Sequence, residues 1–286
     1  MIAVAKQLEG KIALITGATS GIGRVAALEL AAQGAELYLV CRSQIKAEAI
    51  CKYICEHTGN EQIHILHGDL ASLTDVRRIA NEFIVLEKPL HILLNNAGVF
   101  NLKREITVDG HELMFAVNYL AHFLLTNLLL DRLKSSAQAR IVNVASDAHM
   151  LTKSLQIHDL SFEDGFKALK VYSHSKLANI LFTRELASRL GNSELTVNAI
   201  HPGTVATNLG AQNGWVGLIL NKLMKIFLQS PEKGVRTSIY ACLSPDLNGV
   251  TGQYFANCRK HEPKPWAKDD EMARQLWSAS VKLTML

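Results

Sequence analysis

The sequence predicts an α/β protein, in which a doubly wound parallel sheet of about seven strands carries helices on both faces. Short apolar runs of strand length alternate with longer segments of helical periodicity. This alternation is typical of parallel strands that are buried on both faces. Polar and glycine residues also follow the ends of successive runs, and the carboxyl ends of parallel strands meet at one edge of a sheet. That edge is where we expect the functional site.

The composition indicates an ordinary globular protein. Of its 286 residues, 48% are hydrophobic and 20% are charged, and the formal net charge is +4 without a run of five like charges. A nucleic-acid partner is therefore not expected. The five cysteines suggest no disulfide framework, and no Cys or His cluster predicts a metal site. The length allows one or two domains, but no linker or repeat divides it, so we expect one domain over residues 1–286.

The strands are predicted from buried apolar runs and the helices from their periodicity and end signals. We expect strands at Lys11–Thr16, Ala35–Cys41, Gln62–His67, His91–Leu94, Arg140–Val144, Leu195–Ile200 and Gln253–Phe255. Helices are expected from the first glycine-rich turn to about Gln33, at Ser43–His57, Ser72–Leu86, Asp109–Leu133 and Pro231–Cys242, and around Tyr172 as far as Leu190. An irregular connection is expected at 147–168, and a polar tail after Phe255.

A glycine-rich turn separates the first strand from the first helix. A glycine turn between a buried strand and a helix N-terminus is the arrangement that holds a phosphate on backbone N–H groups. The glycines could also simply close a tight loop. The candidate phosphate-binding residues are Gly17, Thr19, Ser20, Gly21, Ile22, Gly23 and Arg24.

Tyr172 and Lys176 are four residues apart and share one face of a predicted helix. A nearby ammonium favours the phenolate and lowers the pKa of a tyrosine from about 10 toward neutrality, which makes the phenol a usable acid and base. The simpler interpretation is a surface tyrosine beside a solvated lysine. The other strand-end residues favour the catalytic interpretation, because they supply the partners that such a tyrosine needs. Asn118, in the middle of an apolar helix, is interpreted as bending the helix or holding a water.

Taken together, these motifs resemble the short-chain dehydrogenases/reductases, which have a Rossmann fold. The match covers almost the whole chain and rests on Thr-Gly-x-x-x-Gly-Ile-Gly, Asp69-Leu70, Asn95-Asn-Ala-Gly98, Asn118, Ser146, Tyr172-x-x-x-Lys176 and Pro202-Gly203. The closer likeness is to the retinol dehydrogenases and their WW-domain-containing relatives. Cys41-Arg42, Val117–Thr126 and Ser175–Asn179 carry that likeness.

The resemblance implies a role for each catalytic candidate. Tyr172 would exchange a proton with the substrate oxygen, and Lys176 would lower its pKa and bind the nicotinamide ribose. Ser146 would hold and polarise the carbonyl, and Asn118 would support a water that relays protons through Lys176. Relatives often pair through the helices that carry Asn118 and Tyr172, which implies a homodimer. The further cofactor contacts implied are Asp69, Leu70, Asn95, Ala97, Gly98, Pro202, Gly203, Thr204, Val205 and Thr207.

The cofactor is predicted to be NADP(H). A site that prefers NAD(H) places a carboxylate about 20 residues after the glycine turn, to hold both ribose hydroxyls. Cys41 and Arg42 occupy that region here, and a guanidinium suits a 2′-phosphate. Arg24 is expected to reach the same phosphate. The alternative is that Arg42 is only a solvated residue at a strand end.

The substrate is predicted to be lipophilic. Trp215–Leu228 is apolar on a broad face, and we interpret residues 208–229 as a lid over the substrate. A helix lying in a membrane surface is the alternative, because 14 residues are too few to span a bilayer. The resemblance suggests a retinoid, and a steroid or another lipophilic carbonyl is the alternative.

The N-terminus shows no signal peptide and lacks the hydrophobic anchor that membrane-bound retinol dehydrogenases commonly carry. We therefore expect a cytoplasmic protein or one peripheral to an intracellular membrane. The long connection between Ser146 and Tyr172 fits the retinol dehydrogenase branch. A non-catalytic NADPH-sensing protein remains a rival, although such a protein would be expected to lack the tyrosine or the lysine.

Overall fold

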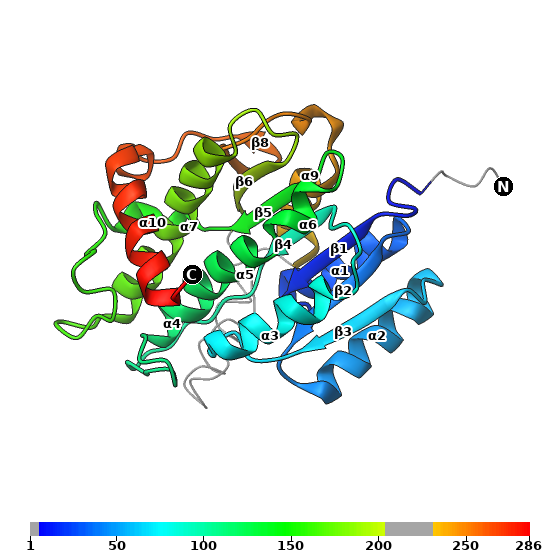
Figure 1. The fold of residues 1–286 in the computed structure, drawn as a ribbon, viewed down its shortest axis with the longest axis horizontal. Helices are drawn as coiled ribbons and strands as arrows, with labels where there is room; N and C mark the ends of the chain where they lie inside the picture. Colours follow the sequence, from blue (N-terminus) through cyan, green and yellow to red (C-terminus); the bar gives the residue numbers. More distant parts are fainter. Residues whose placement is uncertain (1–5, 204–230) are drawn as a thin grey trace.

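The computed structural model describes residues 6–203 and 231–286, and these residues form one eight-stranded sheet with helices on both faces (Figure 1). The strand order is β3-β2-β1-β4-β5-β6-β7-β8, so the order reverses between β1 and β4. β1 to β7 pair in parallel and β8 pairs antiparallel with β7. The predicted doubly wound sheet is confirmed. The strands are β1 (Ile12–Thr16), β2 (Glu36–Cys41), β3 (Ile63–His67), β4 (Ile92–Asn95), β5 (Arg140–Val144), β6 (Thr196–His201), β7 (Tyr254–Ala256) and β8 (Arg259–Lys260).

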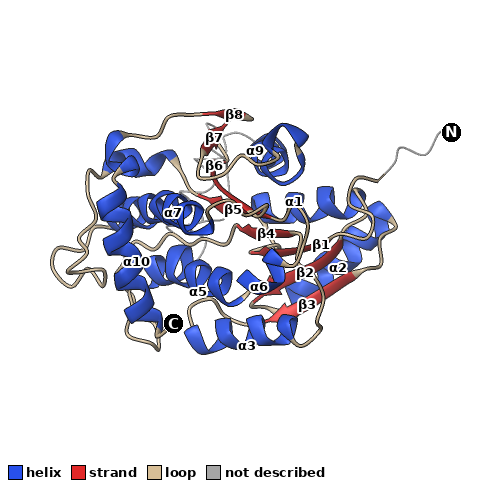
Figure 2. Ribbon diagram, turned by 45° about the horizontal axis from the view of Figure 1, so that its top comes forward, coloured by secondary structure: helices blue, strands red, loops and turns tan. Residues whose placement is uncertain are grey.

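The helices divide between the two faces of the sheet, as Figure 2 shows. α1, α2 and α9 cover one face, α3, α5 and α7 cover the other, and α10 packs on the outer side of α7. The helices are α1 (Gly21–Ala32), α2 (Gln44–Thr58), α3 (Leu73–Ile84), α4 (Leu113–Phe115), α5 (Ala121–Leu128), α6 (Leu130–Lys134), α7 (Ala168–Leu190), α9 (Pro231–Leu243) and α10 (Asp270–Thr284). Shorter turns are the π-helical η1 (Ala116–Leu120) and the 3₁₀ segments η2 (Asp147–Leu151), η4 (Pro245–Leu247) and η5 (Pro265–Lys268).

The two layers of helices explain why the strands read as apolar runs. Ile12 and Leu14 of β1 belong to the core beneath α3, α5 and α7, while Ala13 and Ile15 belong to the core beneath α1 and α2. Successive side chains of a strand point to opposite faces, so a strand covered on both faces needs apolar residues at every position. All five residues of β1 are buried.

The helix expected at Asp109–Leu133 begins later and is interrupted. Its first residues form a turn instead, in which the N–H of Thr107 donates to the carbonyl of His111 at 2.8 Å and Gly110 has a φ of +81°. Helical structure begins at Leu113, where the carboxylate of Glu112 caps the N–H of Phe115 at 2.8 Å. The helix then passes through the π-helical turn η1 into α5 and α6.

The polar tail expected after Phe255 is wrong, because this segment forms β8, η5 and the amphipathic helix α10. Asp269 caps α10 by accepting from the N–H of Met272 at 2.9 Å, and the acidic Asp270 and Glu271 follow in the first turn. Carboxylates at a helix N-terminus are stabilised by the helix dipole. The charged residues belong to the outer face of this helix, and its inner face is buried.

The buried face of α10 packs against the helices that carry the catalytic candidates. The ring of Trp277 lies 5.0 Å from that of Phe123 in α5 and 5.9 Å from that of Phe182 in α7. The hydroxyls of Tyr119 and Ser280 share a hydrogen bond of 2.7 Å. Figure 1 shows α10 running alongside α7 at the edge of the molecule. The C-terminal helix is therefore part of the main core.

The predicted lid at 208–229, with Trp215–Leu228, lies outside the described residues, as do Thr204, Val205 and Thr207. Among the helices of residues 6–203 and 231–286, none combines the length and the apolar character needed to cross a bilayer.

Leu276→Ala tests the packing of α10. Leu276 is fully buried, so the substitution is expected to lower the free energy of unfolding by about 2–5 kcal/mol. Urea unfolding followed by circular dichroism measures this change. The neighbouring exposed Gln275→Ala is the control and should change stability by less than about 0.5 kcal/mol. Equal values for the two variants would contradict the packing.

Candidate active site

The glycine-rich turn between β1 and α1 packs closely against the loop after β4 and against itself. Gly17 has a φ of +70°, and a Cβ there would lie 2.8 Å from the Cα of Ala97. A Cβ on Gly23 would lie 2.2 Å from the carbonyl oxygen of Gly17, so only glycine fits at these positions. Ser20, the N-cap residue of α1, makes no side-chain hydrogen bond to the helix, and the first turn holds no acidic residue. The N–H groups at this end of α1 therefore suit a dinucleotide pyrophosphate.

The other residues predicted for this turn differ in exposure. Ser20 and Arg24 are exposed, and Thr19 and Gly21 are half-buried. The side chain of Ile22 is buried in the core beneath α1, so only its backbone can face a ligand.

The loop after β4 is tied to the loop after β1. The hydroxyl oxygen of Thr16 accepts hydrogen bonds from the N–H groups of Asn96 at 2.9 Å and Ala97 at 3.0 Å. The side-chain amide of Asn96 in turn donates to the carbonyl of Thr16 at 2.8 Å. These bonds hold Ala97 and the half-buried Gly98 beside the glycine turn, where the strand order reverses.

Asn95, predicted as a cofactor contact, has its side chain inside the protein. It is 1% exposed, and its amide donates to the hydroxyl of Thr126 at 2.9 Å and to the side-chain oxygen of Asn143 at 2.8 Å. The side chain therefore supports the end of β4 between the sheet and α5. Any direct contact of this residue with a cofactor would come from its backbone.

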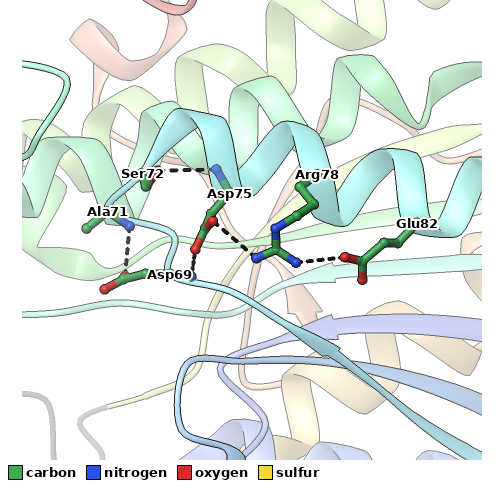
Figure 3. A network of polar contacts seen from close by, with 6 residues as sticks. All are labelled: Asp69, Ala71, Ser72, Asp75, Arg78 and Glu82. Atoms are coloured by element: carbon green, nitrogen blue, oxygen red, sulfur yellow. Dashed lines mark hydrogen bonds and ion pairs between the residues drawn. The ribbon is translucent and has the colours of Figure 1, made fainter.

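Asp69 follows β3 and is held by the first turn of α3, as Figure 3 shows. Its N–H donates to Oδ2 of Asp75 at 2.8 Å, and its own Oδ1 accepts from the N–H of Ala71 at 2.9 Å. The hydrogen bond from the Asp69 backbone, aided by Arg78, lowers the pKa of Asp75 below its ordinary value. The side chain of Leu70 is buried in the core. The segment is thus oriented by α3 and presents only Asp69 at the surface.

The two arginines predicted to bind a 2′-phosphate flank the end of β2. Arg42 directly follows this strand, and its Nη1 lies 3.6 Å from Oδ2 of Asp69 with 73% of the side chain exposed. Arg24 lies in the first turn of α1, and its guanidinium is 4.9 Å from the ring centroid of Tyr53 in α2. A guanidinium over an aromatic face is held without losing its charge or its donors. Both groups remain able to take an anion.

Asn118 lies in η1, where the N–H of Ala121 donates to the carbonyl of Ala116, five residues back. Its Oδ1 accepts from the N–H of Val99 at 2.7 Å, and its Nδ2 donates to the carbonyl of Val99 and the hydroxyl of Ser175, each at 3.1 Å. The amide therefore sits where the helix departs from α-helical geometry. It connects the loop after β4 to α7.

The carbonyl of Asn118 faces the same region as the Lys176 ammonium. It accepts from Nδ2 of Asn179 at 3.1 Å and from Nδ1 of His122 at 3.3 Å. Nζ of Lys176 donates to the carbonyl of Val144 at 2.9 Å, and Nδ2 of Asn179 lies 3.5 Å from that carbonyl. Asn179 therefore links the lysine to Asn118. The resemblance implies a relay water at this position. Such a water would hydrogen-bond to the Asn118 carbonyl, which also accepts from Nδ2 of Asn179.

Lys176 is almost completely buried. It is 3% exposed, and no carboxylate in the described part of the chain lies within 4.0 Å of its ammonium. Burial lowers the pKa of Lys176 from 10.5 to about 8, because the charged form loses its hydration. A buried lysine whose pKa is lowered toward neutral pH is typical of a functional site.

Tyr172 lies beside this lysine, with its ring packed edge-on against Phe100 at 5.5 Å. Nζ of Lys176 is 5.6 Å from the centre of the Tyr172 ring. Burial raises the pKa of Tyr172 to about 12, and a hydrogen bond with Ser146 offsets this in part. The expected lowering toward neutrality is therefore absent in the protein alone. The reason is that burial opposes the phenolate, and the hydrogen bond with Ser146 offsets only part of this effect.

Ser146 follows β5 and begins η2 with an extended backbone. Its hydroxyl oxygen accepts from the N–H of Ala148 at 3.1 Å and is hydrogen-bonded to Tyr172. A hydroxyl that accepts from a backbone N–H is polarised and becomes a better donor to a carbonyl oxygen. Ser146, Tyr172, Lys176 and Asn118 are thus brought together at the carboxyl end of the sheet.

Pro202 and Gly203 follow β6 at the same edge. Both are half-buried, and Gly203 has a φ of +87°. Four residues that contact this cluster were not among the predicted site residues: His122, Asp147, Asn179 and His201. Asn179 could have been found, because it lies three residues after Lys176 and shares its helix face. His122 could have been found in the same way, because it lies four residues after Asn118 and its Nδ1 faces the Asn118 carbonyl. Asp147 and His201 contact each other across two strand ends, which sequence spacing does not indicate.

The cysteines lie apart from this chemistry. All five are free thiols, and burial raises the pKa of Cys41, which precedes Arg42, to about 12. Such a thiol is unreactive. Among the described residues, no group of three His, Cys, Asp or Glu side chains is arranged to hold a metal ion.

Comparison with known proteins identifies the family. The family model for short chain dehydrogenases matches residues 11–214. Retinol dehydrogenase 12 of Mus musculus is 42% identical over 277 residues, covering 97% of this chain and 87% of that protein. Retinol dehydrogenase 14 of Mus musculus is 44% identical over 287 residues, covering 96% and 85%. The chain belongs to the short-chain dehydrogenases.

Solved structures agree with this assignment. A protein of Mycobacterium paratuberculosis is 33% identical with a TM-score of 0.77, covering 97% of this chain and 94% of that one. A protein of Escherichia coli CFT073, described as a short chain dehydrogenase and solved with NADPH, is 25% identical with a TM-score of 0.69, covering 89% and 99%. The chain is an oxidoreductase of the retinol dehydrogenase-like branch that acts on CH–OH groups.

Lys176→Met tests the cost of the buried ammonium. A pKa lowered from 10.5 to about 8 means that charging this group in the fold costs about 3 kcal/mol. We expect the free energy of unfolding of the variant at pH 7 to be higher by about 1–3 kcal/mol, because the loss of the hydrogen bond to Val144 offsets part of the gain. The variant should also lose turnover. The gain should shrink as pH rises from 8 to 10.5, because the folded wild type then sheds a proton that the unfolded chain keeps.

Urea unfolding at pH 7 and at pH 10 measures this difference. Lys153→Met, at an exposed lysine, is the control and should show neither the gain nor its pH dependence. A loss of stability in Lys176→Met at pH 7 would contradict the buried charge.

Proposed function

We propose that the protein is an NADP(H)-dependent oxidoreductase that interconverts an alcohol and a carbonyl on a lipophilic substrate. The observation that carries this proposal is the cluster of Tyr172, Ser146 and the buried Lys176 at the same sheet edge as the glycine turn. The proposal covers a single catalytic domain over residues 1–286.

The side chains divide the proton chemistry between them. Ser146 donates a hydrogen bond to the substrate carbonyl oxygen and keeps its proton, while its own oxygen accepts from the N–H of Ala148. Tyr172 gives its phenol proton to that oxygen in reduction and takes it back in oxidation. When bound, the nicotinamide supplies the hydride to the carbonyl carbon or accepts it from there. Its oxidised ring also brings a positive charge toward Tyr172 and Lys176. Lys176 holds the ribose and adds its own charge, and together these offset the burial that raises the Tyr172 pKa.

The preference for NADP(H) rests on charge at the end of β2. Neither Cys41 nor Arg42 is a carboxylate, and the exposed guanidinium of Arg42 has only the 3.6 Å contact with Asp69 to exchange for a phosphate. Arg24, held over Tyr53, adds a second cation. The NADPH in the Escherichia coli structure supports the same choice. The set proposed for the cofactor also includes the glycine turn, Asp69 and the β4 loop.

A lipophilic substrate is supported by the relatives and by one described contact. The relatives named retinol dehydrogenases make a retinoid the first candidate, and steroids or other lipophilic carbonyls follow. Phe100 packs edge-on against Tyr172 and places an aromatic ring beside the reacting position. The proposed lid at 208–229 would add apolar cover.

We further propose a cytoplasmic protein or one peripheral to an intracellular membrane, with Trp215–Leu228 as the membrane contact if that segment is not the lid. A homodimer is proposed through the helices that carry Asn118 and Tyr172, as the resemblance implies; α10 packs on these helices through Trp277.

The rival function is NADPH sensing without chemistry. The two functions differ in turnover, so consumption of NADPH with a panel of lipophilic aldehydes and ketones separates them. The Tyr172–Ser146 pair favours the enzyme, because a sensor could use Lys176 to hold the ribose but has no use for a proton-transfer pair.

Tyr172→Phe is expected to abolish turnover and to leave NADPH affinity unchanged. The substitution removes only the phenol oxygen, and proton transfer by such a group is worth roughly 10²–10⁴ in rate. Steady-state kinetics and NADPH fluorescence titration measure the two quantities. If the variant kept more than about a tenth of the wild-type kcat, the role of this tyrosine would be wrong.

Arg42→Ala is expected to weaken NADPH binding by roughly 1.5–3 kcal/mol, the range for hydrogen bonds to charged groups, with little effect on NADH. Titration of each nucleotide into both proteins measures the difference. Arg274→Ala is the matched control, since that exposed arginine contacts Glu271 within α10 instead. Equal kcat/KM for NADH and NADPH in the wild type would refute the cofactor assignment.

A further inference from the structure

Asp147, directly after Ser146, contacts the ends of two neighbouring strands. Its Oδ2 lies 3.2 Å from Nε2 of His201 at the end of β6, and its Oδ1 accepts from the hydroxyl of Tyr254 in β7 at 2.9 Å. The last residue of β6 and the first residue of β7 therefore meet at one carboxylate just beyond β5.

The partners of His201 determine its protonation. Its Nδ1 lies 3.4 Å from the backbone N–H of Asp147, which can only donate, so Nδ1 is the acceptor. The ring proton is then on Nε2, which donates to the Asp147 carboxylate. The side chain is 10% exposed, and burial lowers the pKa of His201, so the neutral ring is the form present. Both ring nitrogens thus bind the same residue, which fixes the orientation of the ring.

Tyr254 supplies the second fixed donor. It is 2% exposed, and burial together with the Asp147 charge raises the pKa of its phenol, so the proton stays on the hydroxyl. Its ring also packs edge-on against His149 at 5.3 Å, and Nδ1 of His149 lies 2.7 Å from the carbonyl of Ser146. Tyr254 therefore contacts two residues that follow Ser146, namely Asp147 and His149.

The contact between Asp147 and His201 lies just beyond the paired residues of β5 and β6. The last ladder bond runs from the N–H of Ala145 to the carbonyl of Ile200 at 2.8 Å. The register pairs Val144 with Ile200, so Ala145, Ser146 and Asp147 lie opposite His201, Pro202 and Gly203 as the register continues. The side-chain contact between Asp147 and His201 thus sets how Ser146 lies relative to Pro202–Gly203.

We propose that Asp147, His201 and Tyr254 are positioning residues that hold Ser146 at a set distance from the Pro202–Gly203 segment. This rests on the proposed function, in which Ser146 holds the carbonyl and the segment after β6 contacts the nicotinamide. The three residues touch neither reactant. They fix the separation between the hydride donor and the carbonyl carbon, and small errors in such a separation reduce rates strongly.

The test compares His201→Leu, which removes both contacts, with His201→Gln, which restores a donor to the carboxylate. Each protein is measured for kcat, NADPH affinity and the primary isotope effect with 4-deuterated NADPH. We expect His201→Leu to lower kcat by about tenfold to a hundredfold, with unchanged NADPH affinity and an isotope effect that becomes larger and more temperature-dependent. His201→Gln should recover most of the rate.

Tyr254→Phe and His261→Leu complete the design. Tyr254→Phe removes a single hydroxyl and should shift the isotope effect in the same direction, which keeps the proposal testable if His201→Leu does not fold. His261→Leu removes an exposed imidazole whose ring is 6.2 Å from that of Tyr254, and should match the wild type. An unchanged isotope effect in folded His201→Leu and Tyr254→Phe would overturn the proposal, whatever happens to their stability.

A readout without turnover separates this proposal from the proposed function. The fluorescence lifetime of bound NADPH reports how firmly the nicotinamide is held. We expect a changed lifetime in His201→Leu and the wild-type lifetime in His261→Leu. Absence of turnover in the wild type would refute the proposed function alone, whereas equal lifetimes in wild type and His201→Leu would refute the positioning role.

Discussion

The candidate site depends on one energetic constraint, the burial of the Lys176 ammonium. A charged group inside a fold loses its hydration, and only strong hydrogen bonds or an opposite charge can offset that loss. Here the described surroundings offer the carbonyl of Val144 at 2.9 Å but no carboxylate within 4.0 Å. The pKa of Lys176 is lowered accordingly to about 8. The fold therefore gives up stability where a nucleotide ribose and a tyrosine would make use of a positive charge.

The polar side chains next to Lys176 have hydrogen-bond partners, so they add no further desolvation cost. Asn118 uses every group of its side chain on Val99 and Ser175, and Asn179 bridges the carbonyls of Asn118 and Val144. A buried polar network rigidifies a structure only when its members are satisfied. The π-helical turn is part of this solution, because it shifts the main-chain bonding and leaves the Asn118 carbonyl facing Asn179. The π-helical turn and the position of Lys176 are thus coupled through the hydrogen bonds of Asn179.

The sequence predicts the elements whose burial is uniform and misses those whose partners are distant. Parallel strands covered on both faces read as apolar runs, so the seven parallel strands were expected within a residue or two of their observed ends. α10 was read as a polar tail, because its exposed charges obscure a narrow apolar face that includes Ala273 and Leu276. Asp109 was assigned to a helix although it lies in a turn before Leu113. The contacts of Asp147 join the last residue of β6 and the first residue of β7, and no spacing along the chain encodes them.

His122 joins the end of β1 to the π-helical turn, and its partners determine where its proton lies. The hydroxyl oxygen of Thr16 accepts from two N–H groups of the β4 loop, so its own proton points to Nε2 of His122 at 2.9 Å. The ring proton must then be on Nδ1, which faces the carbonyl of Asn118 at 3.3 Å. Burial and the charge of Lys176 lower the pKa of His122 to about 3, which keeps the ring neutral near pH 7. A proton on Nε2 would oppose the Thr16 hydroxyl and break this contact. The neutral imidazole therefore connects the end of β1, before the glycine turn, to the π-helical turn through one pair of hydrogen bonds.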